Sequence, residues 1–171
     1  MIQKLKEIGI EKSLIAINLG PTGNTSVIKD TETLHNLLEQ IGRDKIILVG
    51  LSKGGLTVSN YVAKYGTKNI SAVITISSPL GGTMLPDYFM PADHIARVEL
   101  GYKSNFTQEL KKNLPFYHIV PTWDHIIVPT DSASIDGPNH KSKIYVGLNG
   151  HLSIQDAPEV IQYVGDWIRK N

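Results

Sequence analysis

The chain has 171 residues, of which 41% are hydrophobic and 19% charged, and it contains no cysteine. This length fits one domain with its own hydrophobic core, and the composition is that of a globular protein. The formal net charge of +1 gives no field that would favour nucleic acid or an anionic membrane, and the lack of cysteine excludes disulfides, thiolate metal sites and cysteine nucleophiles.

The sequence has neither the apolar length of a membrane-spanning helix nor the N-terminal apolar stretch of a signal peptide. We therefore expect no integral membrane segment and a cytoplasmic location.

In the first part of the chain, apolar runs alternate with amphipathic stretches, which is typical of a mostly parallel sheet covered by helices. Residues 14–19 are an apolar run that ends in a Gly-Pro loop, and they predict a strand. Residues 31–41 repeat apolar side chains at helical spacing, with Asp30 or Thr31 as the expected N-cap. Residues 45–49 are continuously apolar after the initial lysine, as expected for a central strand buried on both faces.

The second part continues this alternation, so we predict a single α/β domain over residues 1–171. Helices are predicted at 54–65 and 157–168, and further strands at 72–76, 116–120 and 144–146. The stretch around 80–110 is the least regular and contains several glycines and prolines. A connection of that length is more often a binding cap or lid than a simple link.

Residues 50–54, Gly-Leu-Ser-Lys-Gly, match the pattern G-x-S-x-G between a buried strand and a helix. A serine on so tight a turn has strained backbone geometry, which requires small residues two positions to either side. The turn would lift the Ser52 hydroxyl above the sheet, where the Lys53 backbone N–H and the helix N-terminus favour an oxyanion. An incidental serine in a glycine-rich turn is the plain alternative, and a phosphate-binding loop would need a G-K-[ST] ending that is absent from this turn.

A serine hydroxyl needs a base within hydrogen-bond reach. His151 follows the last predicted strand, so it is expected at the same sheet edge as Ser52, whereas its rival His140 precedes that strand. The adjacent Asp-His pairs at 93–94 and 124–125 lack any established ligand spacing, so we expect no catalytic metal.

Four segments, in this order, resemble the α/β-hydrolase superfamily and specifically its lipase- and esterase-like branch. They are Val49–Leu56, Thr75–Thr83, Asp124–Pro129 and Gly150–Leu152. The resemblance implies a three-layer α/β sandwich and a triad in the chain order serine, acid, histidine. It therefore implies Ser52 as nucleophile, Asp124 as the orienting acid and His151 as base, with no cofactor. Asp131 and Asp136 are the competing acids.

The family pattern contains one more strand before the segments that match. Residues 1–9 resemble the helix that follows the family's oxyanion loop, so we expect an N-terminally truncated sheet without the strand between 14–19 and 45–49. Loss of one oxyanion donor typically costs about two to three orders of magnitude in turnover. A truncated gene product, a substitute donor at Gly20–Gly23 and a partner chain that completes the sheet stay open, and the last would give a homo-oligomer.

The expected function is a serine hydrolase that cleaves carboxylic esters, lipids among them, through an acyl-Ser52 intermediate. Residues 75–83 resemble the lipase segment that leads into a substrate cap, which is the one hint that the acyl group is apolar. Thioesters, amides and acyl transfer stay open. The alternative is a catalytically weak or inactive relative that serves as a binding or assembly module.

Overall fold

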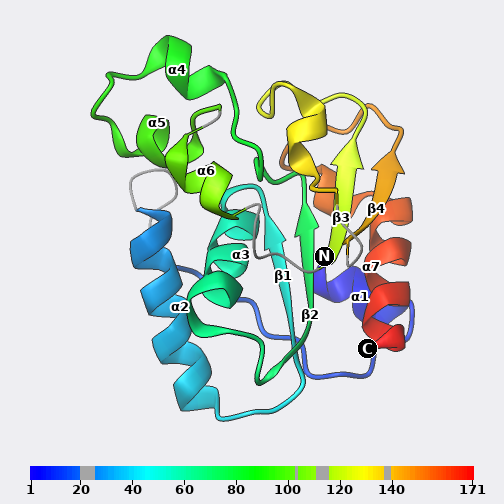
Figure 1. Cartoon of the computed structure of the whole chain (residues 1–171). Coiled ribbons are helices and arrows are strands. Elements are labelled where there is room, and N and C mark those ends of the chain that lie inside the picture. Colours follow the sequence, from blue (N-terminus) through cyan, green and yellow to red (C-terminus); the bar gives the residue numbers. More distant parts are fainter. Residues whose placement is uncertain (20–25, 103, 111–115, 137–139) are drawn as a thin grey trace.

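A parallel β-sheet forms the middle layer of the fold in a computed structural model that describes residues 1–19, 26–102, 104–110, 116–136 and 140–171. In this part of the chain the sheet has four strands in the order β1-β2-β3-β4 (Figure 1). The strands are β1 (Ile46–Leu51), β2 (Ile70–Ile76), β3 (Phe116–Pro121) and β4 (His140–Tyr145). Because all four run in parallel, their carboxyl ends meet at one edge.

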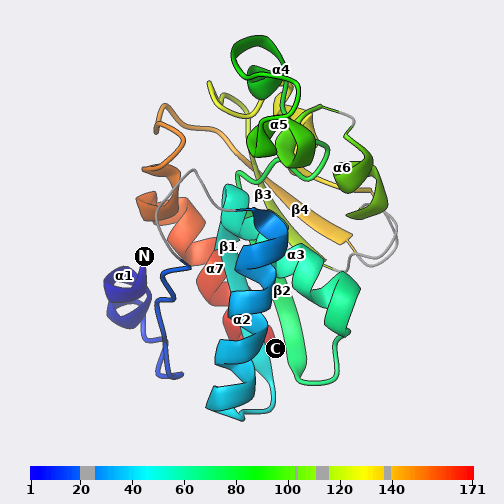
Figure 2. The same cartoon turned by 90° about the vertical axis from the view of Figure 1, so that its left-hand side faces the viewer.

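Helices cover both faces of the sheet and complete a three-layer sandwich (Figures 1 and 2). The helices α2 (Val27–Ile41) and α3 (Lys53–Tyr65) lie on one face, and α1 (Ile2–Glu7) and α7 (Pro158–Lys170) lie on the other. Side chains alternate between the faces along each strand, so Val73 packs with α2 and α3 while Ile74 packs with α1 and α7. None of the described helices is long and apolar enough to cross a bilayer.

Residues 80–110, called the 80–110 segment below, lie beyond the carboxyl ends of the strands (Figure 1). They contain α4 (Leu85–Phe89), α5 (Ile95–Leu100) and α6 (Asn105–Leu110). The buried Glu99 of α5 accepts hydrogen bonds from Ser26 Oγ (2.5 Å) and Val27 N (2.6 Å), the first groups of α2. The segment is therefore fastened to the N-terminus of α2.

The prediction of a strand at 14–19 is wrong, because these residues adopt no regular secondary structure. A strand needs a neighbour that exchanges backbone hydrogen bonds with it. Among the described residues, β1 pairs only with β2, and residues 14–19 join no ladder. Leu14, Ile17 and Leu19 are instead partly buried against the two helical layers, which explains the apolar pattern without a strand.

The prediction that residues 45–49 form a central strand is also wrong, since β1 lies at the edge of the described sheet. Its side chain at Val49 is 37% exposed. The central position belongs to β2, which is paired on both sides and whose last five residues are all buried. The apolar sequence of β1 reflects helices over its faces rather than strands on both of its edges.

The helix predicted at 31–41 begins earlier, at Val27, and Ser26 is its N-cap through a 3.1 Å bond from Ile28 N. Asp30, one of the two predicted caps, lies inside the first turn and forms a 2.7 Å ion pair with Lys53 Nζ. Apolar periodicity marks the helix only from Leu34 onward, because the buried positions between Val27 and Leu34 are the polar residues Asp30 and Thr31.

A buried chain of hydrogen bonds crosses the sheet face that carries α2 and α3. Thr75 Oγ1 lies 2.8 Å from His118 Nδ1, and His118 Nε2 lies 3.0 Å from His140 Nδ1. His118 is only 1% exposed. Burial, and to a smaller degree the neighbouring His140, lowers the pKa of His118 to about 4. His118 is therefore neutral in the folded protein at every pH above that value.

We predict that the folded protein loses stability as the pH falls from 6.5 to 4. In this window the unfolded chain protonates His118 while the folded protein does not, so the free energy of unfolding decreases by up to about 3 kcal/mol. His140, whose pKa is also lowered by burial, adds to the loss in the same direction. Urea unfolding at pH 7 and pH 5 measures the change, and His118→Gln should remove most of it. Equal losses in the wild type and in His118→Gln would contradict this assignment.

Candidate active site

Ser52 lies between the end of β1 and the first residue of α3, with φ 53° and ψ −126°. A positive φ is unfavourable for a residue with a side chain and persists only where neighbouring contacts impose it. Here the Ser52 N–H donates to Ile76 O (3.0 Å) and the Ser52 carbonyl accepts from Gly55 N (2.9 Å). The tight turn therefore holds the Ser52 side chain at the carboxyl edge of the sheet.

The glycines around Ser52 differ in the space that is available for a side chain. A methyl group on Gly50 would overlap the backbone of Gly54 and Gly55, and one on Gly55 would overlap the side chain of Ser78. A methyl group on Gly54 would meet nothing within 4 Å. The expectation of small residues two positions to either side of Ser52 therefore holds for Gly50 but not for Gly54, and the second crowded position is Gly55.

His151 lies between Ser52 and Asp124 in a continuous chain of hydrogen bonds. Its Nε2 is 2.8 Å from Ser52 Oγ and its Nδ1 is 2.7 Å from Asp124 Oδ2. Ser52 follows β1, Asp124 follows β3 and His151 follows β4, and both Asp124 and His151 are only 6% exposed. The structure thus brings together the three residues that the sequence proposed. This arrangement can transfer a proton from the hydroxyl to the imidazole and stabilise the resulting imidazolium.

The carboxylate of Asp124 is surrounded by hydrogen-bond donors. Oδ1 accepts from the backbone N–H groups of Ile126 (2.7 Å) and Ile127 (3.0 Å), and Oδ2 accepts from the Ser77 hydroxyl as well as from His151. Burial raises the pKa of Asp124, but the bonds from His151, Ser77 and the two amides together hold it well below its usual range. Asp124 is therefore an anion at neutral pH.

Ser77 is a site residue that the sequence patterns did not predict. It follows β2 directly, has φ 46° and places its hydroxyl between Asp124 and His151, 3.3 Å from His151 Nδ1. Its position was a usable signal, because a polar residue just after a parallel strand lies at the same edge as Ser52. The pattern of local sequence alone does not reveal the contact, since Asp124 is 47 residues away.

The alternative base His140 and the alternative acids Asp131 and Asp136 lie outside the hydrogen-bond chain of Ser52, His151 and Asp124. His140 bonds to His118 on the sheet face rather than to Ser52. Asp131 lies in a 3-10 turn at Thr130–Ala133, and both it and Asp136 are exposed. The described residues contain no group of three His, Cys, Asp or Glu side chains that could hold a metal ion.

Lys53 is the residue whose backbone N–H the sequence predicted as an oxyanion donor. It is the first residue of α3, and the first N–H groups of a helix have no acceptor within the helix. Its ammonium group is 2.7 Å from the buried Asp30 carboxylate and therefore points toward α2. The substitute oxyanion donor considered at Gly20–Gly23 lies outside the described residues.

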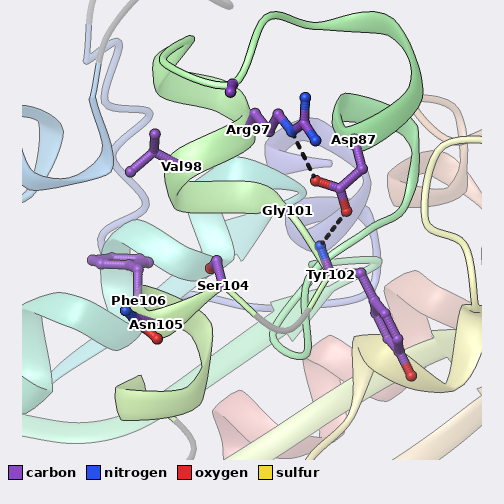
Figure 3. A pocket seen from close by; sticks show the side chains of 9 residues that line it. Asp87, Arg97, Val98, Gly101, Tyr102, Ser104, Asn105 and Phe106 are labelled. Atoms are coloured by element: carbon purple, nitrogen blue, oxygen red, sulfur yellow. Dashed lines mark hydrogen bonds and ion pairs between the residues drawn. The ribbon is translucent and has the colours of Figure 1, made fainter.

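A depression of 390 Å³ lies in the 80–110 segment and not over Ser52. Figure 3 shows the paired side chains of Asp87 and Arg97, with 3.4 Å between Oδ1 and Nε, and it shows Tyr102 on the opposite side of the view from Phe106. Its lining includes no residue of the Ser52-His151-Asp124 chain. We therefore place the candidate site at Ser52 and not in this depression.

A family model described as "alpha/beta hydrolase fold" matches residues 16–134. Among solved structures, a bromoperoxidase from Bacillus anthracis is 20% identical with a TM-score of 0.62, and the match covers 87% of this chain and 76% of that one. A monoacylglycerol lipase from Paleococcus ferrophilus is 20% identical with a TM-score of 0.60, covering 86% and 77%. A putative aryl esterase from Burkholderia cenocepacia is 18% identical with a TM-score of 0.58, covering 88% and 75%. At these identities the likeness establishes the fold.

We predict that alanine lowers the stability at Gly50 and Gly55, where an added methyl group has no room, but not at Gly54. Gly50→Ala and Gly55→Ala should each lower the free energy of unfolding by about 1–3 kcal/mol, the usual cost of overpacking, because the turn must shift to admit the methyl group. Gly54→Ala is the matched control and should stay close to the wild type. Urea unfolding of the three variants measures this, and a loss in Gly54→Ala as large as in Gly50→Ala would refute the assignment.

Proposed function

This chain belongs to the α/β-hydrolase family, and on that premise we propose that it is a serine hydrolase of the lipase- and esterase-like branch. The proposed reaction is cleavage of carboxylic esters through an acyl-Ser52 intermediate. The observation that carries the proposal is the unbroken hydrogen-bond chain from Ser52 through His151 to Asp124.

In the proposed mechanism, Ser52 Oγ attacks the ester carbonyl while His151 Nε2 takes its proton. His151 then returns that proton to the leaving alcohol. In the second half of the reaction it removes a proton from the water that attacks the acyl-enzyme and passes it to Ser52 Oγ as the acyl–Oγ bond breaks and the acid is released. Asp124 keeps the Nδ1 proton of His151 directed toward itself, which leaves Nε2 free to accept. The Lys53 N–H and the start of α3 stabilise the oxyanion.

Exposed apolar residues that neighbour the triad in the sequence support an apolar acyl group. Trp123, which precedes Asp124 in the chain, is 57% exposed, and Leu152, which follows His151, is 68% exposed. We propose that the 80–110 segment acts as a cap over the site; its helix α4 carries the exposed Tyr88 and Phe89. The names of the similar structures, a monoacylglycerol lipase and a putative aryl esterase, agree with this substrate class.

A non-catalytic binding or assembly module is the second candidate. It is favoured by the position of β1, which pairs only with β2 among the described residues, so that its other edge could recruit a strand of a partner. Activity measurements on the wild type distinguish it directly from the hydrolase.

We predict that a fluorophosphonate probe labels the wild type at Ser52 and that the protein hydrolyses short p-nitrophenyl esters. Labelling should vanish in Ser52→Ala and drop sharply in His151→Ala, because the hydroxyl is then missing or lacks its base. His140→Ala is the matched histidine control and should keep its labelling at pH 7.5. A folded wild type that neither reacts with the probe nor cleaves the esters would favour the binding module.

Removal of the Ser77 hydroxyl should weaken catalysis without removing any triad residue. A hydrogen bond to a charged group is worth about 1.5–3 kcal/mol, so we expect kcat/KM of Ser77→Ala to fall by about ten- to a hundredfold. Ser77→Gly should lose as much activity but be more stable than Ser77→Ala, since glycine tolerates the positive φ. Ester hydrolysis and urea unfolding of both variants measure this, and an unchanged kcat/KM would show that the hydroxyl is dispensable.

A further inference from the structure

We propose that Thr83 is a positioning residue that holds the loop around Asp124 in its active shape and joins this loop to the end of α5. The inference rests on the proposed function, in which Asp124 orients His151. Thr83 touches neither Ser52 nor His151 in the described contacts, so it acts through the backbone that surrounds the acid.

The Thr83 hydroxyl uses both of its hydrogen-bonding roles on the same short loop. Thr83 Oγ1 donates to Ile126 O (2.7 Å) and accepts from Val128 N (3.1 Å). Thr83 is 3% exposed, so no water replaces these partners easily. A buried hydroxyl with both donor and acceptor satisfied by backbone fixes the path of that backbone.

The loop to which Thr83 bonds, residues 126–128, also binds the Asp124 carboxylate. The carbonyl of Ile126 and the N–H of Ile127 belong to one planar peptide group. Thr83 holds the oxygen end of that group and Asp124 Oδ1 accepts from its nitrogen end. Rotation of this peptide would break both bonds at once, so the Thr83 hydroxyl determines where one of the two Asp124 amide donors points.

The backbone of Thr83 is bonded at the same time to the end of α5, which lies later in the 80–110 segment. Its N–H donates to Leu100 O (2.8 Å) at the end of α5, and Thr83 forms a parallel bridge with Gly101. The next residue, Met84, donates its N–H to Val128 O (2.8 Å). One residue therefore connects the end of α5 to the peptide that contacts the catalytic acid.

The chain offers variants that isolate the hydroxyl. Thr83→Val keeps the branched shape and the backbone bond to Leu100 but loses both side-chain bonds. Thr83→Ser keeps the hydroxyl, and Thr83→Ala differs from it only by lacking that hydroxyl. Thr107→Val is the matched control, because Thr107 is also fully buried, with its hydroxyl bonded to Ser104 O (3.0 Å) in the 80–110 segment and away from the acid loop.

The experiment measures kcat and KM for a p-nitrophenyl ester and, independently of turnover, the low-field proton NMR signal of the His151–Asp124 hydrogen bond. We expect Thr83→Val to lower kcat by about a hundredfold, as misplacement of a catalytic group does, with KM little changed. Its low-field signal should shift or broaden. Thr83→Ser and Thr107→Val should stay within about threefold of the wild type in kcat and keep the signal.

Unchanged kcat and an unchanged NMR signal in Thr83→Val would overturn the proposal, as would equal kcat in Thr83→Ser and Thr83→Ala. If Thr83→Val fails to fold, the comparison of kcat between Thr83→Ser and Thr83→Ala tests the proposal instead. An inactive wild type would refute the proposed hydrolase, whereas the NMR comparison would still report whether Thr83 positions Asp124. The two failures are therefore distinguishable.

Discussion

The buried carboxylate of Asp124 is the constraint on which the site depends. A charge that is withdrawn from water is tolerated only where donors surround it, and in this site the donors come from three different parts of the chain. His151 follows β4, Ser77 follows β2, and the amides of Ile126 and Ile127 belong to the loop after β3. Solvation of this anion therefore requires that three strand ends lie in register, which ties the chemistry of the site to the pairing of the sheet.

The turn at Ser52 is the second constraint, and it depends on contacts between neighbouring strands. The Ser52 N–H bonds to the last residue of β2, and the side chain of Ser78, just beyond β2, fills the space beside Gly55. The strained backbone at Ser52 is thus supported by the adjacent strand rather than by its own helix alone. A change in the β1–β2 register would alter both the nucleophile and the position of Ser77.

Local patterns predicted much of the fold and pointed to Ser52 and His151, whereas the family resemblance was needed to choose Asp124 over Asp131 and Asp136. The G-x-S-x-G turn marks Ser52, and Asp124 and His151 follow runs that the structure contains as β3 and β4. The sequence did not reveal the residues whose role depends on distant partners, such as Ser77 and Thr83, because no local period links them to the acid loop. The strand predicted at 14–19 failed for a related reason: an apolar run does not specify whether a neighbour exists to pair with it.

The hydrogen bond that Glu99 accepts from Val27 N, the first amide of α2, has a consequence for access to the site. If the 80–110 segment swung away as a rigid flap, this carboxylate would lose its partners and the helix would lose its terminal acceptor in the same movement, while the bridge between Thr83 and Gly101 would also open. Such a motion would therefore break all of these bonds together. A motion confined to the short outer helix α4, whose Tyr88 and Phe89 already face solvent, would leave these anchors intact and would disturb instead the bonds of Asp87 to Arg97 and to Tyr102 N.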